Sequence, residues 1–169
     1  TREKGDKIMT VNSENTERRV VSVIVVNEAS VLSRITNLFS GRGYNITSLT
    51  VAPIPDSKYS RLTIVTAGSI RVIEQITKQL HKLIPVLKVY EHADLVEKEM
   101  ALVKFPISEN LNEISILCEA YNGKIVNSGG NMIIAMVADE PKRVGHFLDA
   151  IKRYNPKEIV RSGAVALER

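Results

Sequence analysis

Aromatic residues are scarce in this sequence, which has no tryptophan and only three phenylalanines among 169 residues. No aromatic pair interrupts a basic strand, so few side chains are available to stack on nucleic-acid bases. The net charge of +4 comes from interleaved acidic and basic residues rather than from a basic block. Nucleic-acid binding is therefore disfavoured.

Long apolar runs are absent as well. No stretch approaches the roughly 18 apolar residues of a membrane-spanning helix, and residues 1–17 are polar without the apolar core of a signal peptide. The one cysteine, Cys118, falls in an apolar helical pattern, where cysteine is usually a small buried side chain. We therefore expect a cytoplasmic protein with no membrane partner and no disulfide, preceded by a flexible leader at residues 1–17.

The motifs of common catalytic and metal sites are also missing. The sequence has neither a GxSxG nucleophile motif nor a paired acidic cluster, and His81, His92 and His146 have no partners at ligand spacing. Gly41-Arg42-Gly43 lacks the third glycine of a dinucleotide motif and closes a helix instead of following a strand. We predict no catalytic residue, no metal site and no cofactor on this chain.

The first half of the chain reads as a set of six alternating elements. Residues 20–26 are β-branched and almost continuously apolar, which is typical of a strand buried in the middle of a sheet. Pro53 and Pro55 favour an edge position for the strand that precedes them, and Gly41 and Gly43 can end the first helix. The pattern predicts strand, helix, strand, strand, helix and strand at residues 20–26, 30–39, 46–54, 60–67, 70–83 and 86–90.

A second copy of this pattern follows. We expect Gly123 to end its first helix, residues 128–131 to form a hairpin turn, and Pro141 to open its second helix. Its strands are predicted at residues 100–105, 124–127, 132–138 and 159–166, and Glu97–Glu99 is interpreted as the solvated start of a strand. The fold class is therefore α+β, with two tandem βαββαβ modules at residues 18–91 and 98–169, each with its helices on one face of an antiparallel sheet.

Polar residues in the first module indicate a small-ligand site. Asn27 follows the first strand, and the helix that comes next leaves about four backbone N–H groups unpaired at its start, which suits a carboxylate. We expect Asn45, which opens the next strand, to lie at the same end of the sheet, and its amide offers a donor and an acceptor. With Leu32 and Ile46 nearby, the site would fit a branched-chain amino acid. The alternative is that Asn27 or Ser30 only caps the helix and Asn45 only adopts a turn conformation.

Several long segments carry a family resemblance. The run RGYNITSLTVAP, with VSVIVVNEASVLSRITNLFS before it and SRLTIVT, EQITKQLHKLIPVLKV, VEKEMALVK and RSGAVAL after it, resembles the small regulatory subunit of acetohydroxyacid synthase (acetolactate synthase). The resemblance covers residues 18–168. It implies that the first module is an ACT domain and the second a further ferredoxin-like domain, and that the chain forms a homodimer.

The resemblance also implies a function. Members bind valine between paired ACT domains, and they activate and feedback-inhibit a catalytic large subunit that carries thiamine diphosphate, Mg²⁺ and FAD in branched-chain amino acid biosynthesis. Pairing of the edge strand at residues 46–54 across a twofold axis would build two effector sites from both chains. A second hypothesis is an ACT-like amino-acid-binding interaction module with no catalytic partner, although no basic helix-turn-helix segment supports a transcriptional version of it.

Effector-binding residues follow from the resemblance by position. They are Asn27, Ala29, Ser30, Val31 and Leu32 at the start of the first helix, and Gly43, Asn45, Ile46 and Ala52 around the second strand. Ser30 departs from the family, which usually has glycine there. Because glycine lets a ligand approach the backbone closely, we expect the affinity for the effector or the choice of effector to differ here.

Overall fold

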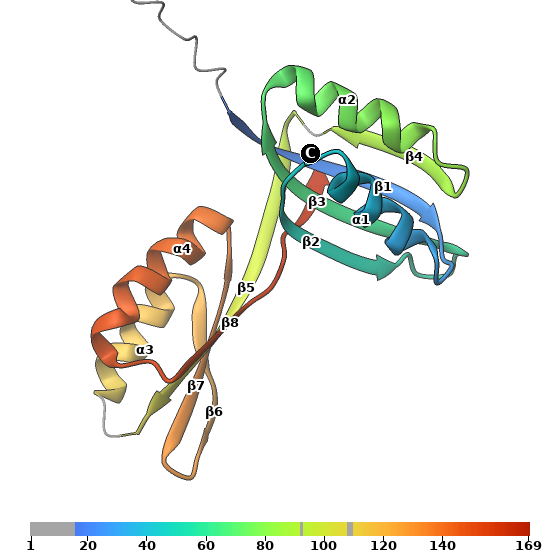
Figure 1. The fold of residues 1–169 in the computed structure, drawn as a ribbon. Helices are drawn as coiled ribbons and strands as arrows, with labels where there is room; N and C mark the ends of the chain where they lie inside the picture. Colours follow the sequence, from blue (N-terminus) through green and yellow to red (C-terminus); the bar gives the residue numbers. More distant parts are fainter. Residues whose placement is uncertain (1–15, 92, 108–109) are drawn as a thin grey trace, which may run out of the picture.

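The protein consists of two α+β modules joined by a long strand, as seen in a computed structural model (Figure 1) that describes residues 16–91, 93–107 and 110–169. Most of the leader predicted at residues 1–17 and the whole of His92 lie outside the described residues. Glu17 is the first residue of a strand. No helix within these described ranges is long and apolar enough to cross a membrane.

The first module has the predicted order of elements. They are β1 (Glu17–Val26), α1 (Val31–Gly41), β2 (Ile46–Pro53), β3 (Tyr59–Gly68), α2 (Ile70–His81) and β4 (Val86–Glu91). The antiparallel sheet has the order β2-β3-β1-β4, so the apolar β1 is central and β2, which ends at Pro53, is an edge strand, as the sequence predicts. Both helices cover one face of this sheet (Figure 1), and the core between them includes Val21, Ile35 and Leu80.

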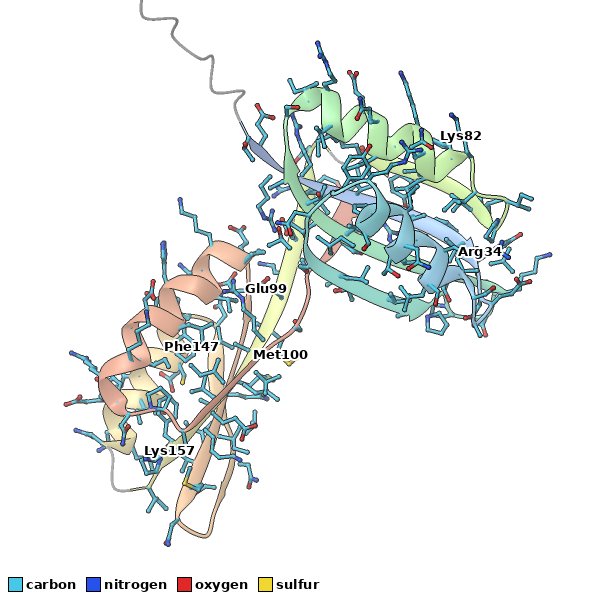
Figure 2. All side chains as sticks on the ribbon, in the orientation of Figure 1. Arg34, Lys82, Glu99, Met100, Phe147 and Lys157 are labelled. Carbon is cyan, nitrogen blue, oxygen red and sulfur yellow. The ribbon has the colours of Figure 1, made fainter. Side chains whose placement is uncertain are left out.

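The second module repeats this arrangement. Its elements are β5 (Leu95–Pro106), α3 (Leu111–Ala120), β6 (Gly123–Gly129), β7 (Met132–Asp139), α4 (Pro141–Ala150), a 3₁₀ turn (Ile151–Tyr154), β8 (Glu158–Arg161) and β9 (Val165–Glu168). The order β6-β7-β5-β8 matches that of the first sheet. Pro141 opens α4 as predicted, and Phe147 of that helix is fully buried in the core (Figure 2). The predicted fold class, two tandem ferredoxin-like modules, is confirmed.

Gly123 has a different role from the predicted one. The helix α3 ends at Ala120, and Asn122, with φ of 59°, takes the left-handed conformation that turns the chain into β6. Gly123 is instead the first residue of β6, and a Cβ built on it would lie 2.5 Å from the Met136 carbonyl oxygen and 2.6 Å from Val137 Cγ2. Glycine is therefore required here for space, and the prediction that Gly123 ends the helix is wrong.

The last predicted strand, residues 159–166, is two strands separated by a bend at residues 162–164. The strand β8 pairs with residues 101–104 of β5, whereas β9 pairs with residues 95–98 at the other end of the same strand. As a result β5 begins at Leu95, before the expected module boundary at residue 98, and extends from the second module to the first (Figure 1).

The paired strands β9 and the start of β5 cover the back of the first sheet, which is the face without helices. A small apolar cluster forms there from Val20, Val65, Ala164 and Ala166, with Leu95 packed against it. The two modules are therefore joined by packed side chains as well as by the chain itself.

Candidate ligand-binding site

The start of α1 is open. Asn27 N–H donates to the Lys58 carbonyl at 2.9 Å, which fixes the chain as it leaves β1, and Val31 N–H donates to the Glu28 carbonyl at 3.2 Å. Ser30 is the N-cap residue, but its side chain makes no capping hydrogen bond, and no acidic side chain lies in the first turn. Ser30, and not Asn27, therefore holds the N-cap position of the alternative prediction, but the Ser30 side chain does not cap the helix. The partial positive charge of the helix start is not neutralised by an acidic side chain in its first turn.

The side chains at this helix start differ in exposure. Asn27, Ala29 and Ser30 are exposed, and so is Leu32 at 40%. Val31 is only 2% exposed and packs in the core. Since its N–H also has a partner in Glu28, Val31 offers a ligand neither its side chain nor a free amide.

A second group of the predicted residues surrounds the end of α1. Gly43 has φ of +69°, its N–H donates to the Ser40 carbonyl at 3.2 Å, and Tyr44 N–H donates to the Phe39 carbonyl at 2.9 Å. These two bonds form a Schellman motif, and the edge-to-face contact of the Tyr44 and Phe39 rings supplies its apolar part. Gly43 thus ends the helix, as predicted.

Asn45 follows directly and is exposed. Its backbone oxygen accepts a hydrogen bond from Thr66 Oγ1 at 2.5 Å, which anchors the start of β2 to β3. Asn45 does not have a positive φ; Gly43 takes that conformation instead. The alternative that Asn45 is present for a turn conformation is therefore wrong.

The two groups lie at opposite ends of the sheet. Ile46 pairs with Thr66, which pairs with Arg19 near the beginning of β1, whereas Asn27 follows Val26 at the end of β1. Arg19 and Val26 are seven residues apart along β1, which is about 23 Å at roughly 3.3 Å per residue. The expectation that Asn27 and Asn45 share one end of the sheet is wrong for a single chain.

The length of α1 explains this separation. Its 11 residues span about 16 Å and carry the chain back along the sheet before β2 begins. Ala52 is the exception among the residues of the second group, because it pairs with Arg61 near the end of β2. Arg61 in turn pairs with Ile24, so Ala52 lies three residues short of the level of Asn27. Strand alternation places its side chain on the back face together with Ser48 and Thr50.

The strand β2 lies between these groups and has a free edge. It pairs with β3 on one side, and no other described strand pairs with it. Val51 is 42% exposed on this strand. An unpaired edge of this kind can accept a second antiparallel strand through its backbone groups.

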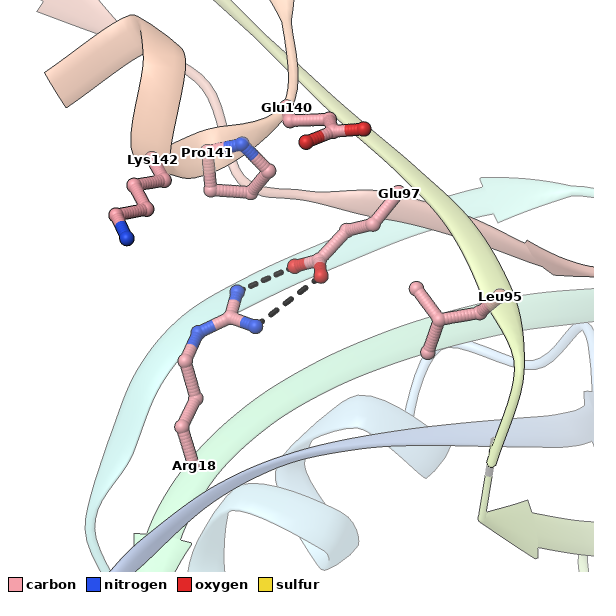
Figure 3. A pocket seen from close by; sticks show the side chains of 6 residues that line it. All are labelled: Arg18, Leu95, Glu97, Glu140, Pro141 and Lys142. Atoms are coloured by element: carbon pink, nitrogen blue, oxygen red, sulfur yellow. Dashed lines mark hydrogen bonds and ion pairs between the residues drawn. The ribbon is translucent and has the colours of Figure 1, made fainter. Parts of the chain in front are cut away.

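Charged residues at the junction of the modules are paired with one another. The Arg18 guanidinium binds both carboxylate oxygens of Glu97 beside a pocket that Pro141 and Lys142 also line (Figure 3). Glu99, only 8% exposed, pairs with Arg161. The interpretation of Glu97–Glu99 as a solvated strand start is wrong, because their partners come from segments far away in the sequence.

The family of the chain follows from comparison with known proteins. Residues 21–88 match the model of the AHAS small subunit-like ACT domain, and residues 98–169 match the model of the small subunit of acetolactate synthase. Fold and matches together define the class, tandem ferredoxin-like proteins whose first module is an ACT domain.

Individual relatives cover almost the whole chain. It is 42% identical over 156 residues to the acetolactate synthase isozyme 3 small subunit of Escherichia coli K12, covering 90% of this chain and 96% of that protein. It is 37% identical to the probable acetolactate synthase small subunit of Archaeoglobus fulgidus over 90% of this chain and 97% of the relative. The crystal structure of the acetolactate synthase small subunit from Thermotoga maritima superimposes with a TM-score of 0.84 at 36% identity, covering 90% of this chain and 98% of that one. The chain belongs to the family of acetolactate synthase small subunits.

Proposed function

We propose that this chain is a regulatory subunit that binds valine, or a related branched-chain amino acid, and transmits its presence to the catalytic large subunit of acetolactate synthase. Thiamine diphosphate, Mg²⁺ and FAD belong to that partner in this proposal, and the small subunit supplies activation and feedback inhibition. The observation that carries the proposal is the position of the two groups of candidate residues at opposite ends of a sheet whose edge strand β2 is free.

A twofold axis at β2 would bring these groups together. If the β2 strands of two chains pair antiparallel, the beginning of one strand lies beside the end of the other. Asn45 of one chain would then reach the end of the sheet where α1 of the partner begins. Each site would take the helix start from one chain and Asn45 from the other, so the separation within a single chain supports a site shared by two chains.

The chemistry of these groups suits an amino acid. A carboxylate would be stabilised by the open amides and the helix dipole at the start of α1. The amide oxygens of Asn27 and Asn45 can accept hydrogen bonds from an ammonium group, and the exposed side chain of Leu32 offers an apolar contact to a branched side chain. Ser30 adds a Cβ and a hydroxyl where the family usually has glycine, which narrows the approach to the backbone.

Ligand binding can be tested on the isolated chain. Valine is expected to raise its melting temperature, because a ligand that binds only the folded protein stabilises it by mass action. Asn27→Ala and Asn45→Ala should each abolish the rise, whereas Asn37→Ala, an exposed asparagine in the middle of α1, should retain it. An unchanged response in both site variants would remove these residues from the site.

A mixed dimer tests whether the site is shared. When a chain carrying Asn27→Ala is paired with a chain carrying Asn45→Ala, one of the two sites contains both substitutions and the other contains neither. Calorimetry on such a dimer, purified with two different tags, should recover one valine site for each dimer. If each site belonged to a single chain, this dimer would bind no valine.

The regulatory role needs the partner. The isolated chain, incubated with pyruvate and the three cofactors, should form no acetolactate. Addition of the chain to the large subunit should raise the activity of the large subunit, and valine should then lower it. Formation of acetolactate by the isolated chain would overturn the assignment.

A further inference from the structure

The bend at residues 162–164 is bonded to both modules within three residues. Ser162 N–H donates to the Met100 carbonyl at 2.8 Å, and Met100 N–H donates to Ser162 Oγ at 2.9 Å, which fastens the bend to β5. Two residues later, Ala164 N–H donates to Ser48 Oγ on β2 at 3.0 Å. Met100 pairs with Ala138 of β7 and so belongs to the second sheet, near the first residues of β5 that join it (Figure 2).

Gly163 rests directly against β2. A Cβ built on it would lie 3.0 Å from both the Leu49 carbonyl oxygen and Ser48 Oγ, and closer still to the Thr50 hydroxyl. That hydroxyl is buried and has no hydrogen-bond partner among the described residues. Gly163 does not have a positive φ, so this position requires glycine for close approach and not for its backbone conformation.

The chain beyond the bend remains on the same face. Arg61 donates from one guanidinium nitrogen to the Ala166 carbonyl and to Ser22 Oγ, both at 3.3 Å. Ala164 is fully buried and Ala166 is 8% exposed where they pack on Val20 and Val65. Hydrogen bonds and apolar packing together therefore hold residues 164–166 on the back of the first sheet.

The strand that the bend touches is an edge strand with an irregular register. As an edge strand β2 has one hydrogen-bonded neighbour, and its register with β3 shifts between Ile46 and Ser48, immediately before the contact with Ala164. Such an irregularity interrupts the hydrogen-bonded ladder locally. Asn45 and Ile46, which belong to the candidate site, come just before this shift.

We infer that the bend at residues 162–164 transmits occupancy of the effector site beside β2 to the second module, with Gly163 and Ser48 as its positioning residues. The inference rests on the proposed function. Pairing and ligand binding at β2 displace Ser48 and Thr50, and Gly163 has no clearance from them. The displacement passes through Ser162 to Met100 and so to β5 and β8 of the second module.

Two substitutions break the contact in different ways. Gly163→Ala inserts a methyl group between the bend and β2, and Ser48→Ala removes only the acceptor of the Ala164 N–H. Gly129→Ala and Ser128→Ala are matched controls, because both positions are exposed on the β6–β7 hairpin and a Cβ at Gly129 meets nothing within 4 Å. Circular dichroism establishes whether each variant is folded. If Gly163→Ala does not fold, Ser48→Ala alone is used for the test.

Three measurements separate binding from transmission. Calorimetry gives the affinity of the full-length chain for valine, hydrogen exchange follows residues 162–168 with and without valine, and an assay of the complex with the large subunit gives inhibition. We expect both variants to bind valine within about threefold of the wild-type affinity, although the change in exchange at residues 162–168 and most of the inhibition are lost. Allosteric coupling typically changes the affinity for a second ligand by about 5- to 150-fold. In both variants, the factor that couples valine binding to the large subunit should fall towards one.

The results distinguish the two claims. Wild-type chain that binds no valine overturns the proposed function. Wild-type chain that binds valine and inhibits, with both variants showing the wild-type change in exchange and the wild-type inhibition, overturns the role of the bend alone. Loss of valine binding in both variants also overturns the role of the bend in transmission, because the contact between the bend and β2 would then be part of the valine site itself.

Discussion

The carboxylate of Asp139, at the end of β7, is 3% exposed and has four hydrogen-bond donors. They are Lys98 Nζ at 3.2 Å, Asn122 Nδ2 at 2.9 Å, Arg143 Nε at 2.6 Å and the backbone N–H of Glu140 at 2.8 Å. Burial alone would raise the pKa of Asp139, but the bonds from Arg143, Glu140, Lys98 and Asn122 outweigh it and hold the pKa well below its ordinary value. One carboxylate thus ties β5, α4 and the α3–β6 turn together.

Asp139→Asn tests this cluster. Breaking a buried ion pair typically costs about 3 kcal/mol, so the free energy of unfolding at neutral pH should fall by roughly that amount. Because the pKa is lower in the folded state, the stabilisation is fully present above the ordinary pKa of about 3.9 and is lost progressively as pH falls from there through the lower pKa of the folded state. Denaturant unfolding should therefore show a constant difference between the wild type and the variant from pH 7 to about pH 4, and a difference that begins to shrink as pH falls to 3.

Asp149→Asn is the matched control. Asp149 and its partner Lys152 are each 72% exposed, and an exposed pair of this kind contributes little. The control should unfold like the wild type. A constant difference between wild type and Asp139→Asn across the whole pH range would show that the charge of Asp139 is not what stabilises the cluster.

The helices and strands differ in how far the sequence determines them. Periodicity and turn residues locate α1, α2 and α4 well, and Pro53 correctly predicts that β2 is an edge strand. Hydrophobic pattern did not separate β8 from β9, because Val160 and Val165 are both apolar and the bend between them depends on contacts with Met100 and Ser48. Such contacts lie far apart in the chain, and no local pattern encodes them.

The candidate site shows the same limit. Residue types and spacing pointed to Asn27 and Asn45, and both are exposed in the first module. Their relative position could not be read from the sequence, because it depends on the path of α1 back along the sheet and on the register of β2 with β3. The residues themselves remain predictions.

The end of α1 offers a comparison of two neighbouring glycines. Gly43 has φ of +69°, whereas Gly41 is helical, and a Cβ at either would meet nothing within 4 Å. Gly43→Ala should lower the free energy of unfolding by about 1 kcal/mol, because alanine is strained at positive φ. Gly41→Ala should raise it by about 0.5 kcal/mol, since alanine favours the helix. Urea unfolding of the two variants tests the opposite signs, and equal effects would contradict the Schellman ending.

At the scale of the whole molecule, the free edge of β2 predicts association. If two chains pair there, the melting temperature should rise with protein concentration over about a hundredfold range, because dimerisation stabilises the folded chain by mass action. Val51→Glu should weaken this dependence, since it places a charge at the edge where the partner would pack. Sedimentation that shows only monomers at every concentration would exclude a site built from two chains.

The pairing of β5 with β9 also determines where chimeras of related chains can be joined. Leu95–Lys98 pairs with Val165–Glu168, and β9 packs on the first module although it follows the second module in the sequence. A cut between the family matches, which end at residue 88 and begin at residue 98, therefore does not yield two self-contained halves. A chimera that takes its ACT domain from one species and the remainder from another should inherit both of those segments, together with the surface of β1 to β3 beneath them, from a single parent. During evolution, substitutions in the two halves are expected to be correlated at these contacts and more independent elsewhere.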